Sequence, residues 1–158
     1  MRWTILAVAV MLASACGFHV RGDASLSARM QAPYLATPDR YTPFHAELQR
    51  SLQAAGAEPA ASPETATAVV RVWADETGRN ILSISARNTP QEYEVYYRVE
   101  YSVTAGGEEI LPRQQLALTR EYAYDETAVL AKEHEERDIV QALARDLAAL
   151  VTRRLAAL

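Results

Sequence analysis

The chain has 158 residues, and its 16 basic and 20 acidic residues give a formal net charge of −4 at pH 7. This acidic balance excludes the broad basic surface that nucleic-acid recognition needs, so we expect no nucleic acid among the partners. Since the chain has only one cysteine, it cannot form an intramolecular disulfide or a redox pair.

The first fifteen residues have the layout of a secretory signal peptide. Arg2 gives a short positive start, an apolar run extends from Trp3 to Ala13, and small residues follow. The run is shorter than the roughly 20 apolar residues that a membrane-spanning helix needs. We therefore expect residues 1–15 to be removed and residues 16–158 to form one periplasmic domain. Without Arg2, 15 basic residues face 20 acidic ones, so this domain carries a net charge of −5.

Cys16 follows the small residues directly. The stretch Ala13-Ser14-Ala15-Cys16 is similar to a lipobox, in which the cysteine receives a diacylglycerol, although Ala13 stands where leucine is preferred. Two or more acyl chains hold a soluble domain stably on a membrane. Gly17 stands where an aspartate would retain a lipoprotein in the inner membrane, which favours the outer membrane. We expect no cofactor besides this covalent lipid. The alternative is an ordinary secreted protein with a free thiol.

The mature chain begins with a predicted strand and a predicted helix. The strand lies near residues 30–35, where Pro33 favours the edge of a sheet. The helix has Thr42 as a suitable N-cap, Pro43 at its first position and Gly56 placed to end it in a left-handed conformation. Its apolar stripe recurs every four residues and consists of Phe44, Leu48 and Leu52.

Alternating residues predict a series of antiparallel strands in the middle of the chain. The predicted strands cover residues 68–75, 82–87, 93–103 and about 115–124. Between them we expect a turn at Gly78-Arg79, a turn or loop at residues 88–90 and a hairpin at Gly106-Gly107. The longest alternation is in the third strand, whose apolar face is formed by Tyr93, Val95, Tyr97, Val99, Tyr101 and Val103.

The same alternation predicts which face of the sheet each side chain occupies. It places Asp75 on the polar face with Arg71 and Trp73, and it places Leu82 and Ile84 on an apolar face. A long C-terminal helix is predicted over roughly residues 129–157. One polar and one apolar face per strand implies that helices cover one side of the sheet only. The predicted fold class is therefore α+β, a two-layer sandwich of a mainly antiparallel sheet and two helices packed on one face.

Motifs for catalysis are not recognisable. The stretch Glu133-His134-Glu135-Glu136 superficially resembles a metalloprotease helix, but Asp138 stands where the second histidine would be. The chain also has no nucleophile elbow and no glycine-rich phosphate loop. We expect a binding protein rather than an enzyme and no metal site. An envelope hydrolase with an unrecognised triad is the alternative.

Three blocks of sequence resemble one protein family. They are Cys16-Gly17-Phe18-His19-Val20-Arg21-Gly22, then Glu92-Tyr93-Glu94-Val95-Tyr96-Tyr97, and finally Leu130-Ala131-Lys132-Glu133 with Glu136 and Asp138 behind it. These blocks and the spacing between them are similar to the LptE family of lipopolysaccharide (LPS)-assembly lipoproteins, so the resemblance covers essentially the whole chain. It implies a four-stranded sheet with two helices.

The resemblance also implies a function. LptE-like proteins sit inside the large outer-membrane β-barrel of LptD, assist assembly of that barrel and help to deliver LPS to the outer leaflet. We therefore expect a lipid-anchored protein of the outer membrane, on its periplasmic side and inside the barrel lumen. The alternative is a stand-alone ligand-binding or structural lipoprotein of the envelope.

Two sets of site residues follow from the resemblance and from the predicted sheet. The LPS-binding basic positions of the family fall on Arg87 and Lys132, whose charges suit phosphate groups. The alternative is that both are solubilising surface charges. The uncovered sheet face is the expected contact with the barrel, unless it is merely solvated. Its candidate interface residues are Arg71, Trp73, Tyr96 and Arg98.

Overall fold

The computed structural model describes residues 26–158. The predicted signal peptide, Cys16 and the first family-like block lie outside the described residues. The elements in chain order are η1 (Ala28–Met30), β1 (Pro33–Ala36), α2 (Pro43–Ala54), β2 (Ala68–Ile84), β3 (Pro90–Ala105), β4 (Glu108–Ala123) and α3 (Val129–Leu155).

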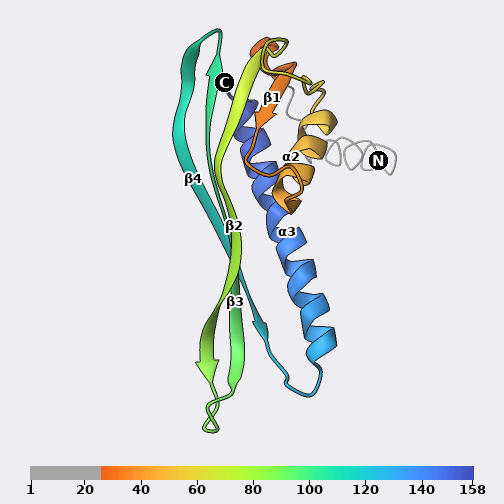
Figure 1. Ribbon diagram of the computed structural model, residues 1–158, viewed down its shortest axis with the longest axis vertical. Coiled ribbons are helices and arrows are strands. Elements are labelled where there is room, and N and C mark those ends of the chain that lie inside the picture. Colours follow the sequence, from red (N-terminus) through yellow and green to blue (C-terminus); the bar gives the residue numbers. More distant parts are fainter. Residues whose placement is uncertain (1–25) are drawn as a thin grey trace, which may run out of the picture.

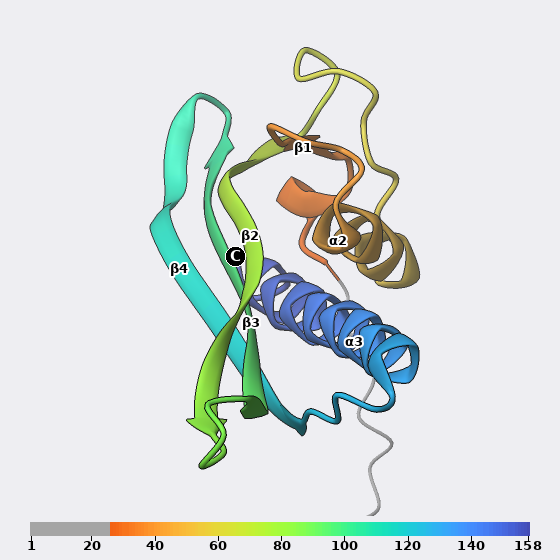
Figure 2. The same ribbon diagram turned by 60° about the horizontal axis from the view of Figure 1, so that its bottom comes forward.

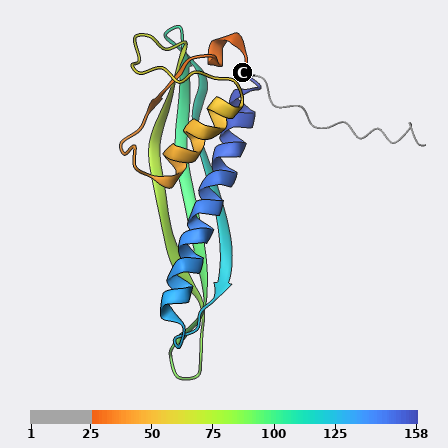
Figure 3. The ribbon, with the colours of Figure 1, turned by 90° about the vertical axis from the view of Figure 1, so that its right-hand side faces the viewer.

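The four strands form one mixed sheet in the order β1-β2-β3-β4. β1 runs parallel to β2, and the other neighbours are antiparallel. α2 and α3 lie side by side against one face of this sheet and leave the other face uncovered (Figures 1 and 2). The predicted α+β sandwich is therefore confirmed, and β1 occupies a sheet edge, as Pro33 predicts. The molecule is elongated along β2, β3, β4 and α3 (Figure 3).

The signals at the two ends of α2 act as predicted. The Thr42 hydroxyl accepts a hydrogen bond of 3.2 Å from the backbone N–H of His45, and Pro43 is the first helical residue. Gly56, just after the helix, has a φ of 87°, a left-handed conformation that glycine adopts without strain. The predicted apolar stripe is buried at Phe44, Leu48 and Leu52.

The core lies between the helices and the apolar face of β3. All six predicted residues of that face, from Tyr93 to Val103, are buried. They pack with buried residues of α3, namely Ile139, Leu143, Ala144, Leu147, Ala148, Val151 and Leu155. Among residues 26–158, no helix is both long enough and apolar enough to cross a membrane.

The turn predicted at Gly78-Arg79 is wrong, because β2 continues through both residues to Ile84 and pairs with β3 along this length. A glycine is needed at position 78 because the side chain of Tyr96 lies directly against the backbone there. A Cβ at Gly78 would lie 2.5 Å from the hydroxyl oxygen of Tyr96 and 2.7 Å from its ring. Gly78 thus lets the Tyr96 ring lie across β2 within a regular strand.

The face predicted for Asp75 is also wrong. The pairing steps from Val72 opposite Tyr101 to Ala74 opposite Glu100, so Trp73 is an extra residue in β2. Such a β-bulge reverses the alternation of side chains beyond it. Asp75 therefore faces the helices, although Trp73 and the residues before it alternate as predicted.

The ends of the strands differ from the prediction as well. β2 ends at Ile84, so Arg87 lies in the turn that follows, and β4 begins at Glu108 rather than near Gln115. Leu82 and Ile84 are not core residues, since 45% and 56% of their surfaces are exposed. Register irregularities beyond Ile81 disturb the alternation there. Alternation alone does not reveal how far the helices extend over the sheet.

Candidate binding surfaces

The open face is the side of the sheet turned away from α2 and α3. It carries Arg71, Trp73, Glu76, Gly78, Asn80, Glu94, Tyr96, Arg98, Glu100, Ser102 and Arg113. Many of these side chains pair across strands. Arg98 forms an ion pair with Glu76 of β2, Arg113 lies 2.5 Å from Glu100, and the amide of Asn80 donates to Glu94 at 3.3 Å. The open face is therefore polar, and part of its charge is neutralised by ion pairs between its own side chains.

Trp73 is the centre of a cationic and aromatic cluster on the open face. The guanidinium groups of Arg71 and Arg113 lie 5.2 Å and 4.9 Å from the centre of its ring, within the range of cation–π attraction. The indole N–H donates a hydrogen bond of 3.0 Å to the hydroxyl of Ser102, which holds the ring in place. The side chain is nevertheless 46% exposed. An ordered tryptophan flanked by arginines is typical of the anchors of protein interfaces.

All four candidate interface residues lie on this one face. In β2, Arg71 lies just before the bulge and Trp73 forms it. In β3, Tyr96 and Arg98 lie opposite the residues of β2 that follow the bulge. Tyr96 lies over Gly78, and Arg98 is held by Glu76. The structure therefore brings these side chains together on one surface and fixes them through their neighbours.

The two predicted basic residues lie at the same end of the molecule. Arg87 is in the turn between β2 and β3, and Lys132 is in the first turn of α3. Figures 1 and 3 show that this turn and the start of α3 lie at the same end. Across the turn, the N–H of Ser85 donates to the carbonyl of Thr89 at 2.8 Å, and Asn88 adopts a left-handed φ of 61°. The turn is thus held in a defined conformation.

Arg87 and Lys132 differ in how free their charges are. Arg87 is exposed and forms no ion pair with any residue of the described part of the chain. Lys132 is only 21% exposed and forms an ion pair of 2.8 Å with Glu135. The N-cap of α3, Ala128, gives no side-chain hydrogen bond to the first turn. The uncapped N–H groups of such a helix start favour an anion, and Lys132 adds a full charge beside them.

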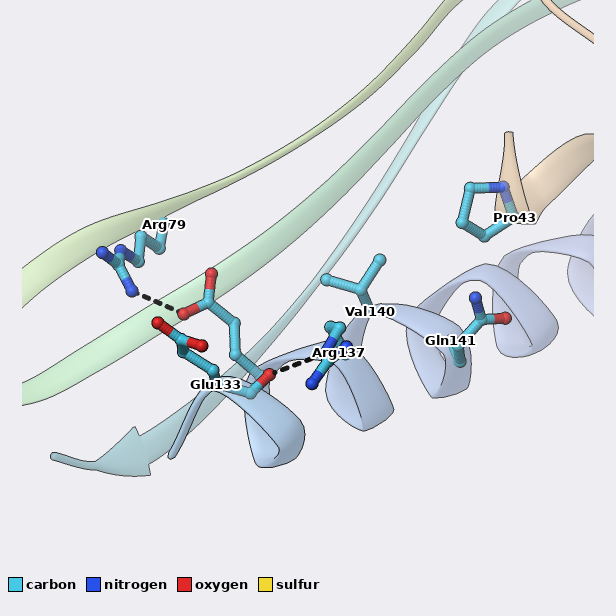
Figure 4. Close-up of a pocket in the computed structure, with 7 residues that line it drawn as sticks. Pro43, Arg79, Glu133, Arg137, Val140 and Gln141 are labelled. Carbon is cyan, nitrogen blue, oxygen red and sulfur yellow. Dashed lines mark hydrogen bonds and ion pairs between the residues drawn. The ribbon is translucent and has the colours of Figure 1, made fainter. Parts of the chain in front are cut away.

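A groove of about 690 Å³ lies beside α3 near the start of α2 (Figure 4). Arg79 of β2 crosses it to form an ion pair of 2.6 Å with Glu136, which also accepts a hydrogen bond of 2.8 Å from the hydroxyl of Tyr122. Burial, together with this hydrogen bond to a carboxylate, raises the pKa of Tyr122 to about 12. This contact was not predicted, because the sequence pattern had placed Arg79 in a turn and not in a strand.

A polar network joins the start of α2 to the sheet. The Asp75 carboxylate accepts a hydrogen bond of 2.5 Å from the Thr42 hydroxyl and one of 2.7 Å from the Tyr97 hydroxyl. The Tyr97 oxygen in turn accepts a hydrogen bond of 3.2 Å from the N–H of Phe44. Burial and the neighbouring carboxylate raise the pKa of Tyr97, so its hydroxyl stays protonated and donates. This network ties the start of α2 to β2 and β3.

The comparison with protein families decides between the classes of protein that such surfaces allow. The sequence model of the protein family LptE, whose description reads 'Lipopolysaccharide-assembly', matches residues 30–155. The chain belongs to the LptE family. Two relatives in the LptE family are similar over most of the chain, and both are named LPS-assembly lipoprotein LptE. The one from Pectobacterium atrosepticum is 28% identical over 92% of this chain and 78% of its own length. The one from Yersinia enterocolitica is 23% identical over 96% of this chain and 73% of its own length.

Solved lipoprotein structures share the fold of this LptE-family chain. The solution structure of an uncharacterized lipoprotein B from Nitrosomonas europaea has a TM-score of 0.74 and 24% identity, covering 89% of this chain and 91% of that one. Rare lipoprotein B from Shewanella oneidensis has a TM-score of 0.69 and 23% identity, covering 80% and 94%. At these identities the likeness concerns the fold, which agrees with the α+β sandwich predicted from the sequence.

Proposed function

We propose that this LptE-family chain is a lipoprotein of the cell envelope that plugs an LptD-like barrel of the outer membrane and assists its assembly. The observation that carries the proposal is the family match over residues 30–155, together with an ordered open face that has the chemistry of an interface. A lipid on Cys16 would hold the domain on the membrane. The function is binding, and we expect no catalytic activity.

The shape of the domain supports a position inside a barrel. β3 has 16 residues, so it is about 50 Å long at roughly 3.3 Å per residue. The apolar band of an outer-membrane barrel is only about 25 Å tall. A domain of this length, aligned with the barrel axis, would extend through the whole height of the apolar band and project beyond it. Barrel interiors are polar, which suits the open face and its cross-strand ion pairs.

Site-specific photo-crosslinking in cells tests this proposal. A photoreactive residue at Tyr96, in the middle of the open face, is expected to give one adduct whose added mass is that of a large barrel protein. The matched control is a photoreactive residue at Tyr41, which lies outside the open face and is 96% exposed, so that the substitution leaves the core intact; it is expected to give much less of this adduct. If Tyr96 gives no adduct while the protein is correctly exported, the alternative of a stand-alone envelope lipoprotein is favoured.

We also propose that the chain binds LPS directly, through Arg87 and Lys132. Arg87 has a free guanidinium, and Lys132 lies beside the uncapped start of α3, so both can approach phosphate groups. Replacing both residues by glutamate is expected to weaken binding of LPS by at least tenfold. The same replacement of Arg29 in η1 and Arg153 in the last turn of α3, two exposed arginines at the other end of the molecule (Figure 1), reverses as many charges. This control should change binding little. Equal effects would mean that the net charge matters and the position does not.

A further inference from the structure

Exposed apolar side chains are concentrated at one end of the molecule. Within residues 26–158, seven large hydrophobic side chains are exposed, and five of them belong to the end of β2 or the start of α3. These five, which we call the apolar tip, are Ile81, Leu82, Ile84, Val129 and Leu130, with exposures from 41% to 75%. The end of β2 and the start of α3 lie at the same end of the domain (Figures 1 and 3). Such a concentration indicates a binding surface.

The position of the apolar tip follows from the local backbone. Register irregularities between Ile81 and Ser83, and again before Ile84, interrupt the regular alternation of β2. Consecutive apolar side chains are therefore not all directed to the side that α3 covers. α3 begins only at Val129, and its second residue, Leu130, is 75% exposed. The first residues of α3 are thus themselves exposed apolar side chains, and the helix does not bury those at the end of β2.

The composition of the apolar tip indicates the kind of partner. All five side chains are aliphatic, and none is aromatic. Anchors of protein interfaces are enriched in tryptophan, tyrosine and arginine, and that combination lies on the open face, around Trp73 and Tyr96. Aliphatic side chains without hydrogen-bonding groups suit hydrocarbon chains, which bind through apolar burial alone. The two surfaces therefore have different chemistry and fit different partners.

The apolar tip also adjoins the two cations proposed to bind phosphate. Arg87 is three residues beyond Ile84 in the turn that ends β2, and Lys132 is two residues beyond Leu130 in the same helical turn. A ligand that joins acyl chains to a phosphorylated sugar presents apolar and anionic groups side by side. At this end of the domain, the end of β2 with its turn and the start of α3 each carry both aliphatic side chains and a cation.

We propose that the apolar tip binds acyl chains of the phosphorylated glycolipid portion of LPS while Arg87 and Lys132 contact its phosphates. This inference rests on the proposed direct binding of LPS and specifies which part of the ligand the domain recognises. The tip would shield part of the hydrocarbon from water while the ligand is transferred.

Binding measurements with chemically trimmed ligands test the proposal. The full mature protein, in detergent, is titrated with intact LPS and with LPS from which the acyl chains have been removed but the phosphates kept. The tip variant replaces Ile81, Leu82 and Ile84 by serine. These residues are exposed, and a urea unfolding curve checks that the variant is folded. The wild type is expected to bind intact LPS at least tenfold more tightly than deacylated LPS, and the tip variant should lose this preference.

Each result bears on the proposal. Unchanged binding of deacylated LPS by the tip variant, with weakened binding of intact LPS, is the expected outcome. Equal affinity of the wild type for both ligands would overturn the acyl-chain contact while leaving phosphate binding intact. A tip variant that keeps its full preference but no longer purifies with a barrel would show that the patch contacts protein and would also overturn it. If the wild type bound neither ligand, direct LPS binding itself would fail.

Discussion

The hydroxyl of Tyr97 donates a hydrogen bond of 2.7 Å to the carboxylate of Asp75 on the neighbouring strand. The same carboxylate holds the Thr42 hydroxyl at the start of α2. Tyr97 is almost completely buried, so this contact replaces the hydration that both polar groups lose on folding. It ties the start of α2 to the helix-facing side of β2 and β3.

Tyr97 and Tyr101 form a matched pair for measuring this contact. Both are buried on the same face of β3, but the Tyr101 hydroxyl has no hydrogen-bond partner among residues 26–158. We expect Tyr97→Phe to lower the free energy of unfolding by about 1–3 kcal/mol, because Asp75 and the N–H of Phe44 lose their partner. Tyr101→Phe should be neutral or slightly stabilising. Urea unfolding of both variants measures the difference, and equal losses would contradict this account.

The close approach of Tyr96 to Gly78 predicts a strong coupling between the two residues. Gly78→Ala alone should destabilise the protein or displace the Tyr96 ring, since the new Cβ would lie 2.5 Å from the hydroxyl oxygen of Tyr96. In a Tyr96→Ala background the same change should be neutral or stabilising by about 0.5–1 kcal/mol, because alanine is favoured over glycine inside a strand. A double-mutant cycle measures the coupling. Additive effects would show that the ring does not lie over Gly78 in solution.

His45 predicts a specific pH dependence of stability. Burial is the main cause that lowers its pKa from the ordinary value of 6.5, and the charge of Arg40 acts in the same direction. The unfolded chain therefore binds a proton more readily than the folded protein. The contribution of neutral His45 to the free energy of unfolding is fully present above the pKa of His45 in the unfolded chain. It is lost as the pH falls through the lower pKa of His45 in the folded protein. Between about pH 7.5 and about pH 5, the wild type should lose stability relative to His45→Gln. A constant difference between the two proteins would contradict the shift.

Trp73 provides a test of the open face that is separate from folding. Just over half of the side chain is buried and its N–H bonds to the buried Ser102 hydroxyl, so Trp73→Ala should lower the free energy of unfolding by about 2–3 kcal/mol; a urea unfolding curve checks that the variant remains folded. If the open face contacts the barrel, the same change should markedly reduce the amount of barrel recovered with the protein. Tyr41→Ala is the control, since Tyr41 is an aromatic residue outside the open face and is 96% exposed. A larger loss from the control would place the interface elsewhere.

The sequence predicted the fold class, both helices and the apolar face of β3, because each depends on local signals. Thr42, Pro43 and Gly56 mark the ends of α2 through their own backbone preferences. The long alternation from Tyr93 to Val103 specifies a strand wherever its partners lie. These signals need no knowledge of the neighbouring elements.

The sequence failed where a neighbour on another strand decides the structure. Gly78 reads as a turn until the Tyr96 ring is placed over it, and Asp75 reads as a polar-face residue until the bulge at Trp73 is known. For the same reason the ion pair between Arg79 and Glu136, which are 57 positions apart, could not be predicted. The candidate cations Arg87 and Lys132 came from the family resemblance. The structure adds that Lys132 forms an ion pair with Glu135, whereas Arg87 forms none with any described residue.

The most direct test of the central claim is affinity purification of the mature protein, tagged at Leu158, from detergent-solubilised outer membranes. Mass spectrometry and densitometry would identify and quantify what is recovered with it. A barrel protein at a ratio near one to one is the predicted result. Recovery of the lipoprotein alone, under conditions that keep other barrel complexes intact, would contradict the plug and leave a stand-alone envelope lipoprotein.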